Sequence, residues 1–317
     1  MNPPAPLTPR IAITLGDPRG IGPEVVRAAL AADDVAGTVD PVIVGPVGAG
    51  IDVDIAVGQW TPGSAAADAG RLAGTALREA VKLAMRDEVE GIVTAPLDKA
   101  ALLAGGFDFP GHTEMLAALT GARTAMMLAS TRDDRPRLRV VLATTHLPLR
   151  AVPAAVTSAA ILEAAELTRE GLRRWFGIDA PRIVLCALNP HAGDGGRFGT
   201  EDDEVLAPAA RAAGIAGPFP ADTVFVRALR GEFDAVIAPY HDVGMTAIKV
   251  ASFGSAVNVT LGLPFPRCSP DHGTAIDIAG KGIADPSSMI AAIVTCRDMI
   301  RRTPKARSAT ASRGQSG

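Results

Sequence analysis

Short apolar runs alternate with longer alanine-rich segments along almost all of the 317 residues. The predicted strands are 11–15, 41–44, 91–94, 125–128, 139–144, 182–188, 235–238 and 256–261. Several are apolar on both faces, as in strands covered by helices on both sides. The predicted helices are 23–32, 64–86, 114–119, 153–176, 202–213 and 287–300. This alternation predicts an α/β protein with a largely parallel sheet, in one large domain or two.

Composition excludes several classes of protein. With 48% hydrophobic and 21% charged residues, the chain has enough apolar side chains to fold around a core. The formal charge of −3 gives no global basic field, so we expect no nucleic-acid partner. The three cysteines, Cys186, Cys268 and Cys296, form no C-x-x-C pair, which argues against disulfides and zinc fingers and for a reducing compartment.

Neither a signal peptide nor a membrane span is expected. The first apolar run is only 11–15, and glycine and proline interrupt the longest uncharged stretch, 250–266. We therefore expect a cytoplasmic protein that makes no contact with a membrane. The charged segment 132–137 is a predicted turn and a candidate hinge, and the polar tail, 302–317, is predicted to be disordered.

Three of the five histidines follow predicted strands: His146, His191 and His241. Ligands in α/β proteins gather at the carboxyl ends of strands, and three neutral imidazoles are typical of a catalytic metal site. Asp194 and Asp242 lie close enough in sequence to orient two of them. Because no short metal-binding motif is present, a structural role for each histidine stays open.

Two glycine-rich segments are candidate ligand loops. The loop 190–203 carries His191 and four glycines, which allow a ligand to approach the backbone closely. The segment 16–24, GDPRGIGPE, makes a tight turn into a helix whose first amides can face an anion. It lacks the glycine spacing of a nucleotide fingerprint, so an ordinary turn is equally consistent.

Candidate anion contacts occur in two places. His112 and Thr113 begin a predicted helix, where free amides and a hydroxyl suit a phosphate or carboxylate, although a simple helix cap fits equally well. Lys249, Asn258 and Arg267 lie in a region almost free of other charge. Isolated cations in such a setting favour anion binding over ordinary solvation.

These motifs together resemble the 4-hydroxythreonine-4-phosphate dehydrogenase family of the pyridoxal phosphate pathway. The resemblance runs in the same order over nearly the whole chain. Its elements are GDPRGIGPE (16–24), VTAPLDK (93–99), FPGHTE (109–114), ATTHLPLR (143–150), LNPHAGDGGRFGTED (188–202), GPFPADTVF (217–225), YHDVG (240–244), VNVTLGLPFPR (257–267) and DHGTAIDIAGKGIAD (271–285).

The resemblance implies a fold like that of isopropylmalate dehydrogenase, with two α/β/α lobes, largely parallel sheets and an active-site cleft between the lobes. The first lobe would comprise 1–130 plus 265–317, and the second 131–264. The resemblance also implies a homodimer with a shared active site.

The last motif, 271–285, is similar to the adenosine loop of the isopropylmalate dehydrogenase superfamily.

The resemblance further implies metal-dependent oxidation of 4-phosphooxy-L-threonine by NAD or NADP, followed by decarboxylation. Asp242 and Asp222 are candidate proton carriers or residues that orient the metal ligands, and the sequence does not choose between these roles. The implied roles are a divalent ion (Zn²⁺, Mg²⁺ or Co²⁺) on His146, His191 and His241; substrate contacts from His112, Thr113, Lys249, Asn258 and Arg267; and cofactor contacts from His272, Gly273, Thr274, Ala275 and Asp277.

Three residues depart from the family pattern: two of them lie close to the predicted metal loops and bear on the substrate, and the third, Asp285, weakens one expected adenine contact. Val243 replaces a common Gln, Asp194 a common Glu, and Asp285 the superfamily's usual Asn. A sister group that oxidises D-threonate or D-erythronate 4-phosphate is therefore an alternative, and another relative acts on a dihydrodiol of terephthalate. Two hypotheses from other classes of function stay open. One is a tri-histidine hydrolase or lyase that uses no nicotinamide, and the other is a non-catalytic protein that binds a phosphorylated ligand.

Overall fold

The computed structural model describes residues 8–131, 138–252 and 255–303. The segment 132–137 and residues 304–317 of the predicted tail lie outside these ranges. Within them, eleven strands form one sheet in the order β3-β2-β1-β4-β11-β10-β5-β6-β9-β7-β8. The strands are β1 (Arg10–Thr14), β2 (Asp40–Val47), β3 (Ile55–Gln59), β4 (Gly91–Thr94), β5 (Ala125–Ser130), β6 (Arg139–Leu142), β7 (Ile183–Cys186), β8 (Ala216–Phe219), β9 (Ala235–Ala238), β10 (Ala256–Leu261) and β11 (Arg267–Pro270).

Helices connect and cover these strands. They are α1 (Gly22–Leu30), α2 (Ala66–Met85), α3 (Lys99–Ala104), α4 (His112–Thr120), α5 (Val152–Ala155), α6 (Ser158–Phe176), α7 (Ala207–Ala213), α8 (Ala221–Leu229), α9 (His241–Ser252) and α10 (Ser287–Arg302). Shorter turns are η1 (Leu149–Ala151), η2 (Pro190–Gly193), the π-turn η3 (Asp202–Leu206) and η4 (Ile276–Ile278).

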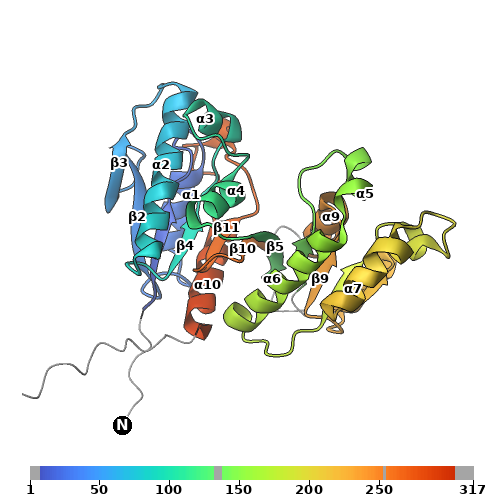
Figure 1. Cartoon of the computed structure of the whole chain (residues 1–317). Helices are drawn as coiled ribbons and strands as arrows, with labels where there is room; N and C mark the ends of the chain where they lie inside the picture. Colours follow the sequence, from blue (N-terminus) through green and yellow to red (C-terminus); the bar gives the residue numbers. More distant parts are fainter. Residues whose placement is uncertain (1–7, 132–137, 253–254, 304–317) are drawn as a thin grey trace, which may run out of the picture.

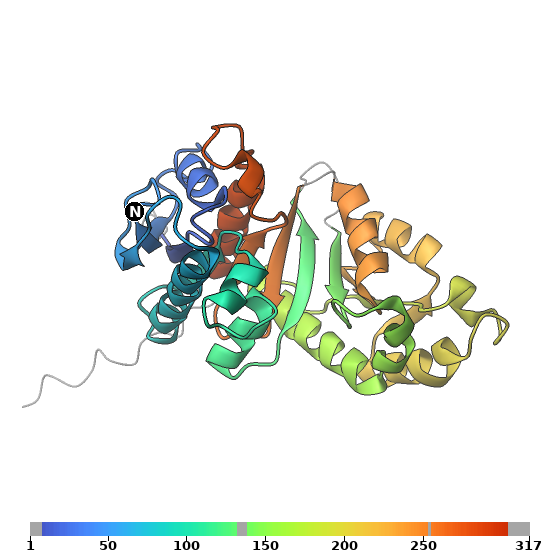
Figure 2. The ribbon, with the colours of Figure 1, turned by 90° about the horizontal axis from the view of Figure 1, so that it is seen from above.

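The predicted α/β class is confirmed. Seven strand pairs are parallel, and the three antiparallel pairs all involve β10 or β5 at the middle of the sheet. Figures 1 and 2 show the N- and C-terminal elements at one end of the sheet and the elements from β6 to α9 at the other. The division into lobes of 1–130 plus 265–317 and of 131–264 stays a prediction.

Several predicted elements differ from those observed. The helix predicted over 153–176 is wrong, because the chain breaks at Val156 and Thr157, whose hydroxyl caps α6 by accepting from Ala160 N. The helix predicted over 202–213 begins as the π-turn, and α10 extends to Arg302, into the predicted tail. Pattern reasoning missed β3, β8, β11, α3, α8 and α9. These elements are short, half-exposed or interrupted by proline and charge.

One face of the sheet is covered continuously. Its apolar cluster joins β1, β4, β5, β6, β9 and β10 to α1, α6, α7 and α10, with Trp175 and Met289 among the buried side chains. The opposite face is covered in two separate parts. One cluster lies under α2 and α4, and the other lies under α8 and α9.

Polar side chains occupy the middle strands on this second face. Because side chains alternate along a strand, Asn258 and Thr260 point away from the face on which Val257 and Val259 join the continuous cluster. By the same alternation, Cys268 points to the continuous cluster and Arg267 points to the second face of the sheet. The middle of the sheet is therefore apolar on one side and polar on the other.

No single helix of the described ranges is long and apolar enough to cross a membrane. One bent pair of helices, Leu149–Ala155 and Ser158–Phe176, is long and apolar enough by length and composition alone, with an angle of 83° between the two parts.

Close packing of α2 against α3 depends on Gly70. A Cβ at this position would lie 1.8 Å from the carbonyl oxygen of Ala101. Alanine favours a helix interior over glycine by about 1 kcal/mol, but a clash with backbone costs about 1–3 kcal/mol or more. We therefore expect Gly70→Ala to lower the free energy of unfolding in denaturant titrations. Arg71→Ala, at the adjacent exposed position, is the control, and a stabilised Gly70→Ala variant would contradict this packing.

Candidate active site

A cavity of about 240 Å³ lies where the two predicted lobes meet. We call it the central cavity. It is lined by Thr94, Pro96, Leu97, Lys99, Gly111, His112, Thr113, Glu114, Met126, His146, Asn258, Arg267, Ser269, Pro270, His272 and Gly273. Its base is the polar strip of β4, β10 and β11, between the two helix clusters of the second face.

Arg267 provides a buried positive charge in this cavity. Its side chain is among the largest that are fully buried, and its hydrogen-bond partners are neutral: Nη1 donates to Thr260 Oγ1 at 3.0 Å, and Nη2 to Thr94 Oγ1 at 2.5 Å. Within the described ranges its Nε has no hydrogen-bond partner, and no carboxylate forms an ion pair with the guanidinium. Burial lowers the pKa of Arg267 to about 10, so the group is still charged at neutral pH.

The N-terminus of α4 opens into the same cavity. Its N-cap is Gly111, which offers no side chain to cap the first amides. His112 and Thr113 follow directly and begin the helix, as their motif predicted, two residues before the range 114–119 predicted for the helix as a whole. Desolvation, and then the charges of Arg267 and Lys99, lower the pKa of His112 well below its ordinary value. This imidazole is therefore neutral at pH 7 and can donate one hydrogen bond and accept another.

Asn258 completes the polar lining. It lies in the middle of β10, and its buried Oδ1 has no hydrogen-bond partner within the described ranges. Buried polar groups are normally paired, so an unpaired oxygen and an unpaired guanidinium nitrogen on two residues that line one cavity indicate a polar ligand. Four of the five predicted substrate residues thus line the central cavity.

Lys249, the fifth, does not line the cavity. It lies near the end of α9, and its Nζ is 3.2 Å from Asp271 Oδ2, with about half of its side chain exposed. Asp222 is an exposed residue in the first turn of α8 and also lies outside the cavity lining.

Two of the three predicted metal ligands lie together. His146 follows β6 with a φ of 42°, His241 begins α9, and their ring centroids are 5.4 Å apart. Asp242 Oδ1 is 2.9 Å from His241 Nδ1, which suits a carboxylate that orients an imidazole. Desolvation lowers the pKa of His146, with smaller effects from Lys99 and His241, which keeps the ring neutral, as a metal ligand must be.

His191 lies elsewhere, in the turn η2, with its ring 6.3 Å from that of Phe198. Buried Asp202 anchors this loop by accepting from the amides of Leu188 and Asn189. Across residues 8–131, 138–252 and 255–303, no three histidine, cysteine or acidic side chains are placed to hold a metal ion. A single copy thus assembles two of the three predicted ligands.

The predicted cofactor loop follows β11. His272 and Gly273 line the central cavity, and His272 Nε2 is buried without a hydrogen-bond partner in the described ranges. The carbonyl of Thr274 accepts from Ile21 N at 2.9 Å, and a Cβ on Gly20 would lie 2.5 Å from that oxygen. Ala275 has a φ of 41°, and Asp277 lies in the exposed turn η4.

A larger cavity, of about 640 Å³, includes Gly20 in its lining. It is lined by Pro18, Arg19, Gly20, Pro23, Glu24, Arg27, Ala49, Gly50, Trp60, Pro62, Gly63, Ala279, Gly280 and Gly282. None of the five predicted cofactor residues lines it, although Ala279, Gly280 and Gly282 belong to the same loop. The loop therefore contributes residues to both cavities.

Sequence reasoning assigned no role to several residues that line the central cavity, namely Thr94, Lys99, Glu114, Met126 and Ser269. Lys99 could have been found from the sequence. It comes shortly after the end of β4, and the three histidines were chosen because they also follow strands. Asp98 before it is a strong N-cap residue. Thr94 and Ser269 gave no signal, because a hydroxyl within a short strand does not reveal which face it occupies.

Comparison with known proteins places this geometry in a family. A family profile described as "Pyridoxal phosphate biosynthetic protein PdxA" matches residues 25–296. A relative from Desulfosudis oleivorans named 4-hydroxythreonine-4-phosphate dehydrogenase is 41% identical, over 92% of this chain and 95% of its own. One from Bradyrhizobium diazoefficiens, named putative D-threonate 4-phosphate dehydrogenase, is also 41% identical, over 89% and 94%.

Solved structures agree with the sequence comparison. The crystal structure of 4-hydroxythreonine-4-phosphate dehydrogenase from Klebsiella pneumoniae superposes with a TM-score of 0.81, at 36% identity, over 92% of this chain and all of that one. The predicted resemblance is thereby confirmed: this chain belongs to the PdxA family of pyridoxal phosphate biosynthetic proteins.

Proposed function

We propose that this chain oxidises 4-phosphooxy-L-threonine to 2-amino-3-oxo-4-phosphooxybutanoate, with NAD or NADP as the hydride acceptor. This β-keto acid loses CO₂ to give 3-amino-2-oxopropyl phosphate, a step toward pyridoxine 5′-phosphate. The names of the relatives support this activity. The observation that carries it is Arg267, a buried cation with neutral partners in the central cavity.

The central cavity suits the phosphorylated substrate. Arg267 and the uncapped amides of α4 would bind an anionic group, with Thr113 as a hydroxyl donor. His112 is neutral and Asn258 has an unpaired oxygen, so both can bind the polar groups of the threonine part. Lys249 would join them only after leaving Asp271.

A divalent ion would be held beside the central cavity by His146 and His241, with His191 as the third ligand. Because His191 lies apart from the other two within one chain, we infer that the site is complete only in a homodimer. When bound, Zn²⁺, Mg²⁺ or Co²⁺ would polarise the alcohol that is oxidised. Asp242, in contact with His241, orients that ring, and Asp222 is a candidate proton carrier that would have to come from another copy or from a closed form.

The nicotinamide cofactor would bind along the loop that carries His272, Gly273, Thr274, Ala275 and Asp277. Two observations support this placement. The loop lines the central cavity at His272 and Gly273 and the larger cavity at Gly280 and Gly282, so a dinucleotide bound along it could present one end to the substrate. Its residue His272 also presents a buried, unpaired nitrogen. Asp277 is exposed and negatively charged, which disfavours the 2′-phosphate of NADP.

Oxidation of D-threonate or D-erythronate 4-phosphate is the second candidate. The Bradyrhizobium relative, with its comparable identity, supports it. These substrates also carry a phosphate and a secondary alcohol, so the cation and helix N-terminus of the central cavity suit them equally. A hydrolase or lyase without nicotinamide, and a non-catalytic binding protein, have no comparable support.

An assay of the purified protein separates these functions. With 4-phosphooxy-L-threonine, a divalent ion and NAD⁺ or NADP⁺, we expect the absorbance of reduced nicotinamide to rise, and a chelator to stop it. The same assay with D-threonate 4-phosphate is the comparison. A signal with the sugar acid alone would move the assignment to the second candidate, and no signal with either would reject dehydrogenase activity.

Replacement of Arg267 by Met should weaken phosphate binding without lowering the free energy of unfolding. Burying an unpaired charge costs stability, so a residue of similar volume without the charge should leave the free energy of unfolding unchanged or higher. Affinity for inorganic phosphate, measured by calorimetry, should fall about 30-fold or more, because a buried charge-assisted contact is lost. Arg86→Met, at an exposed position, is the control. Unchanged phosphate affinity in Arg267→Met would rule out this anion site.

Removal of His241 tests the metal site by a readout other than activity. His241→Ala should abolish binding of the divalent ion in calorimetry, while the free energy of unfolding changes by less than about 0.5 kcal/mol, because the side chain is partly exposed. All five histidines are site candidates, so His272→Ala, in the cofactor loop, is the matched control and should still bind the ion. Full ion binding by His241→Ala would remove it from the ligand set.

A further inference from the structure

Lys99 places a second positive charge in the central cavity. It is the first residue of α3, its exposed side chain lines the cavity, and it makes no ion pair or hydrogen bond with any residue in the described ranges. An exposed lysine is usually only solvated. Lys99 differs because a network of buried and capping groups fixes the backbone from which it projects.

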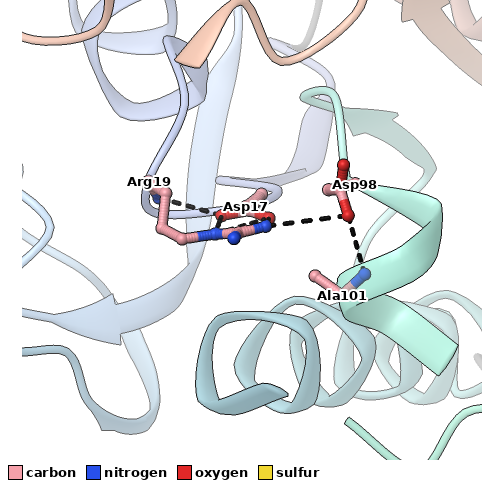
Figure 3. A network of polar contacts seen from close by, with 4 residues as sticks. All are labelled: Asp17, Arg19, Asp98 and Ala101. Atoms are coloured by element: carbon pink, nitrogen blue, oxygen red, sulfur yellow. Dashed lines mark hydrogen bonds and ion pairs between the residues drawn. The ribbon is translucent and has the colours of Figure 1, made fainter. Parts of the chain in front are cut away.

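The network begins at Asp17, whose side chain is fully buried after β1. Arg19 binds it with two nitrogens: Nε is 3.0 Å from Oδ1, and Nη2 is 2.7 Å from Oδ2. The same Nη2 is 3.7 Å from Asp98 Oδ1, which accepts from Ala101 N at 2.7 Å. Figure 3 shows this chain of contacts running from the β1–α1 loop to the first turn of α3.

Backbone contacts lock the same two loops together. Asp17 N donates to Pro96 O at 3.0 Å. Gly16 has a φ of 68°, and a Cβ there would lie 2.1 Å from Pro96 O. The loop that leads into Lys99 is thus held against the β1–α1 loop by close contact as well as by charge.

Lys99 lies beside the N-terminus of α4. A Cβ built on Gly111 would be 3.5 Å from Lys99 Cε and 3.5 Å from Glu114 Oε2. Lys99 and Glu114 therefore flank Gly111, yet they form no ion pair. The positive charges of Lys99 and Arg267 both act on His112, which places this ring within reach of both cations.

We propose that Lys99 is a substrate-contacting residue whose ammonium binds the same phosphate as Arg267, and that Asp98, held by Arg19, positions it. This inference rests on the proposed function, because it assumes a phosphorylated substrate in the central cavity. Two cations and the free amides of α4 match the two negative charges of a phosphate dianion. Arg267 provides a fixed buried contact, and Lys99 closes the exposed side.

The first experiment replaces Lys99 with Met in the full chain. A charge-assisted contact contributes about 1.5–3 kcal/mol, so KM for the phosphorylated substrate and Kd for inorganic phosphate should both rise about ten- to a hundredfold. The value of kcat should stay within about threefold, because the contact is made equally in substrate and transition state. Lys82→Met, at an exposed position on α2, is the matched control and should leave both constants unchanged. Unchanged Kd for phosphate in Lys99→Met would overturn the proposal.

The second experiment tests positioning by Asp98. Asp98→Ala removes the cap of α3 and should raise KM severalfold with little change in kcat. Asp98→Asn keeps the cap and should restore most of the affinity. Equal effects of the two variants on KM would show that the cap does not position Lys99.

Failure of this proposal is distinguishable from failure of the proposed function. If the wild-type protein reduces no nicotinamide with either phosphorylated substrate, the function fails, but the effect of Lys99→Met on phosphate affinity can still be measured. If turnover is normal and phosphate affinity is insensitive to Lys99, only the present inference fails.

Discussion

A guanidinium in the middle of a β-sheet is the constraint on which the rest of this structure depends. Arg267 is buried, and in the described ranges its only hydrogen-bond partners are two threonine hydroxyls. Burying such a charge without a charged partner costs stability, so its presence in the sheet indicates a role in ligand binding. The second face of the sheet accommodates it by leaving β4, β10 and β11 between two helix clusters, and the central cavity occupies that position.

Close contacts at glycine hold the loops around this cavity. Gly16 lies against the loop before α3, and Gly20 lies against Thr274 in the proposed cofactor loop. The β1–α1 loop is therefore wedged between the loop that carries Lys99 and the loop that carries His272. A side chain at either glycine would separate elements that the proposed chemistry requires side by side.

Only two of the three histidines predicted to bind a metal ion meet within one chain. His146 and His241 meet within one chain because β6 and β9 are adjacent, parallel strands with the same carboxyl edge. β7 also pairs with β9, but the long loop after it carries His191 away toward Phe198. This separation is the structural reason to expect a site shared between two copies of the chain.

The sequence by itself determined the α/β class, most strand positions and the family, because periodicity, strand-end chemistry and ordered motifs are local signals. It also selected His112 and Thr113 as a helix start, and Asn258 and Arg267 as isolated polar residues in apolar surroundings; all four line the central cavity, and their substrate contacts stay a prediction. It did not find Lys99, Thr94 or Ser269, or the break before α6. Only the tertiary structure decided which face each short strand presents and which side chains remain unpaired, because both depend on contacts between residues far apart in the chain.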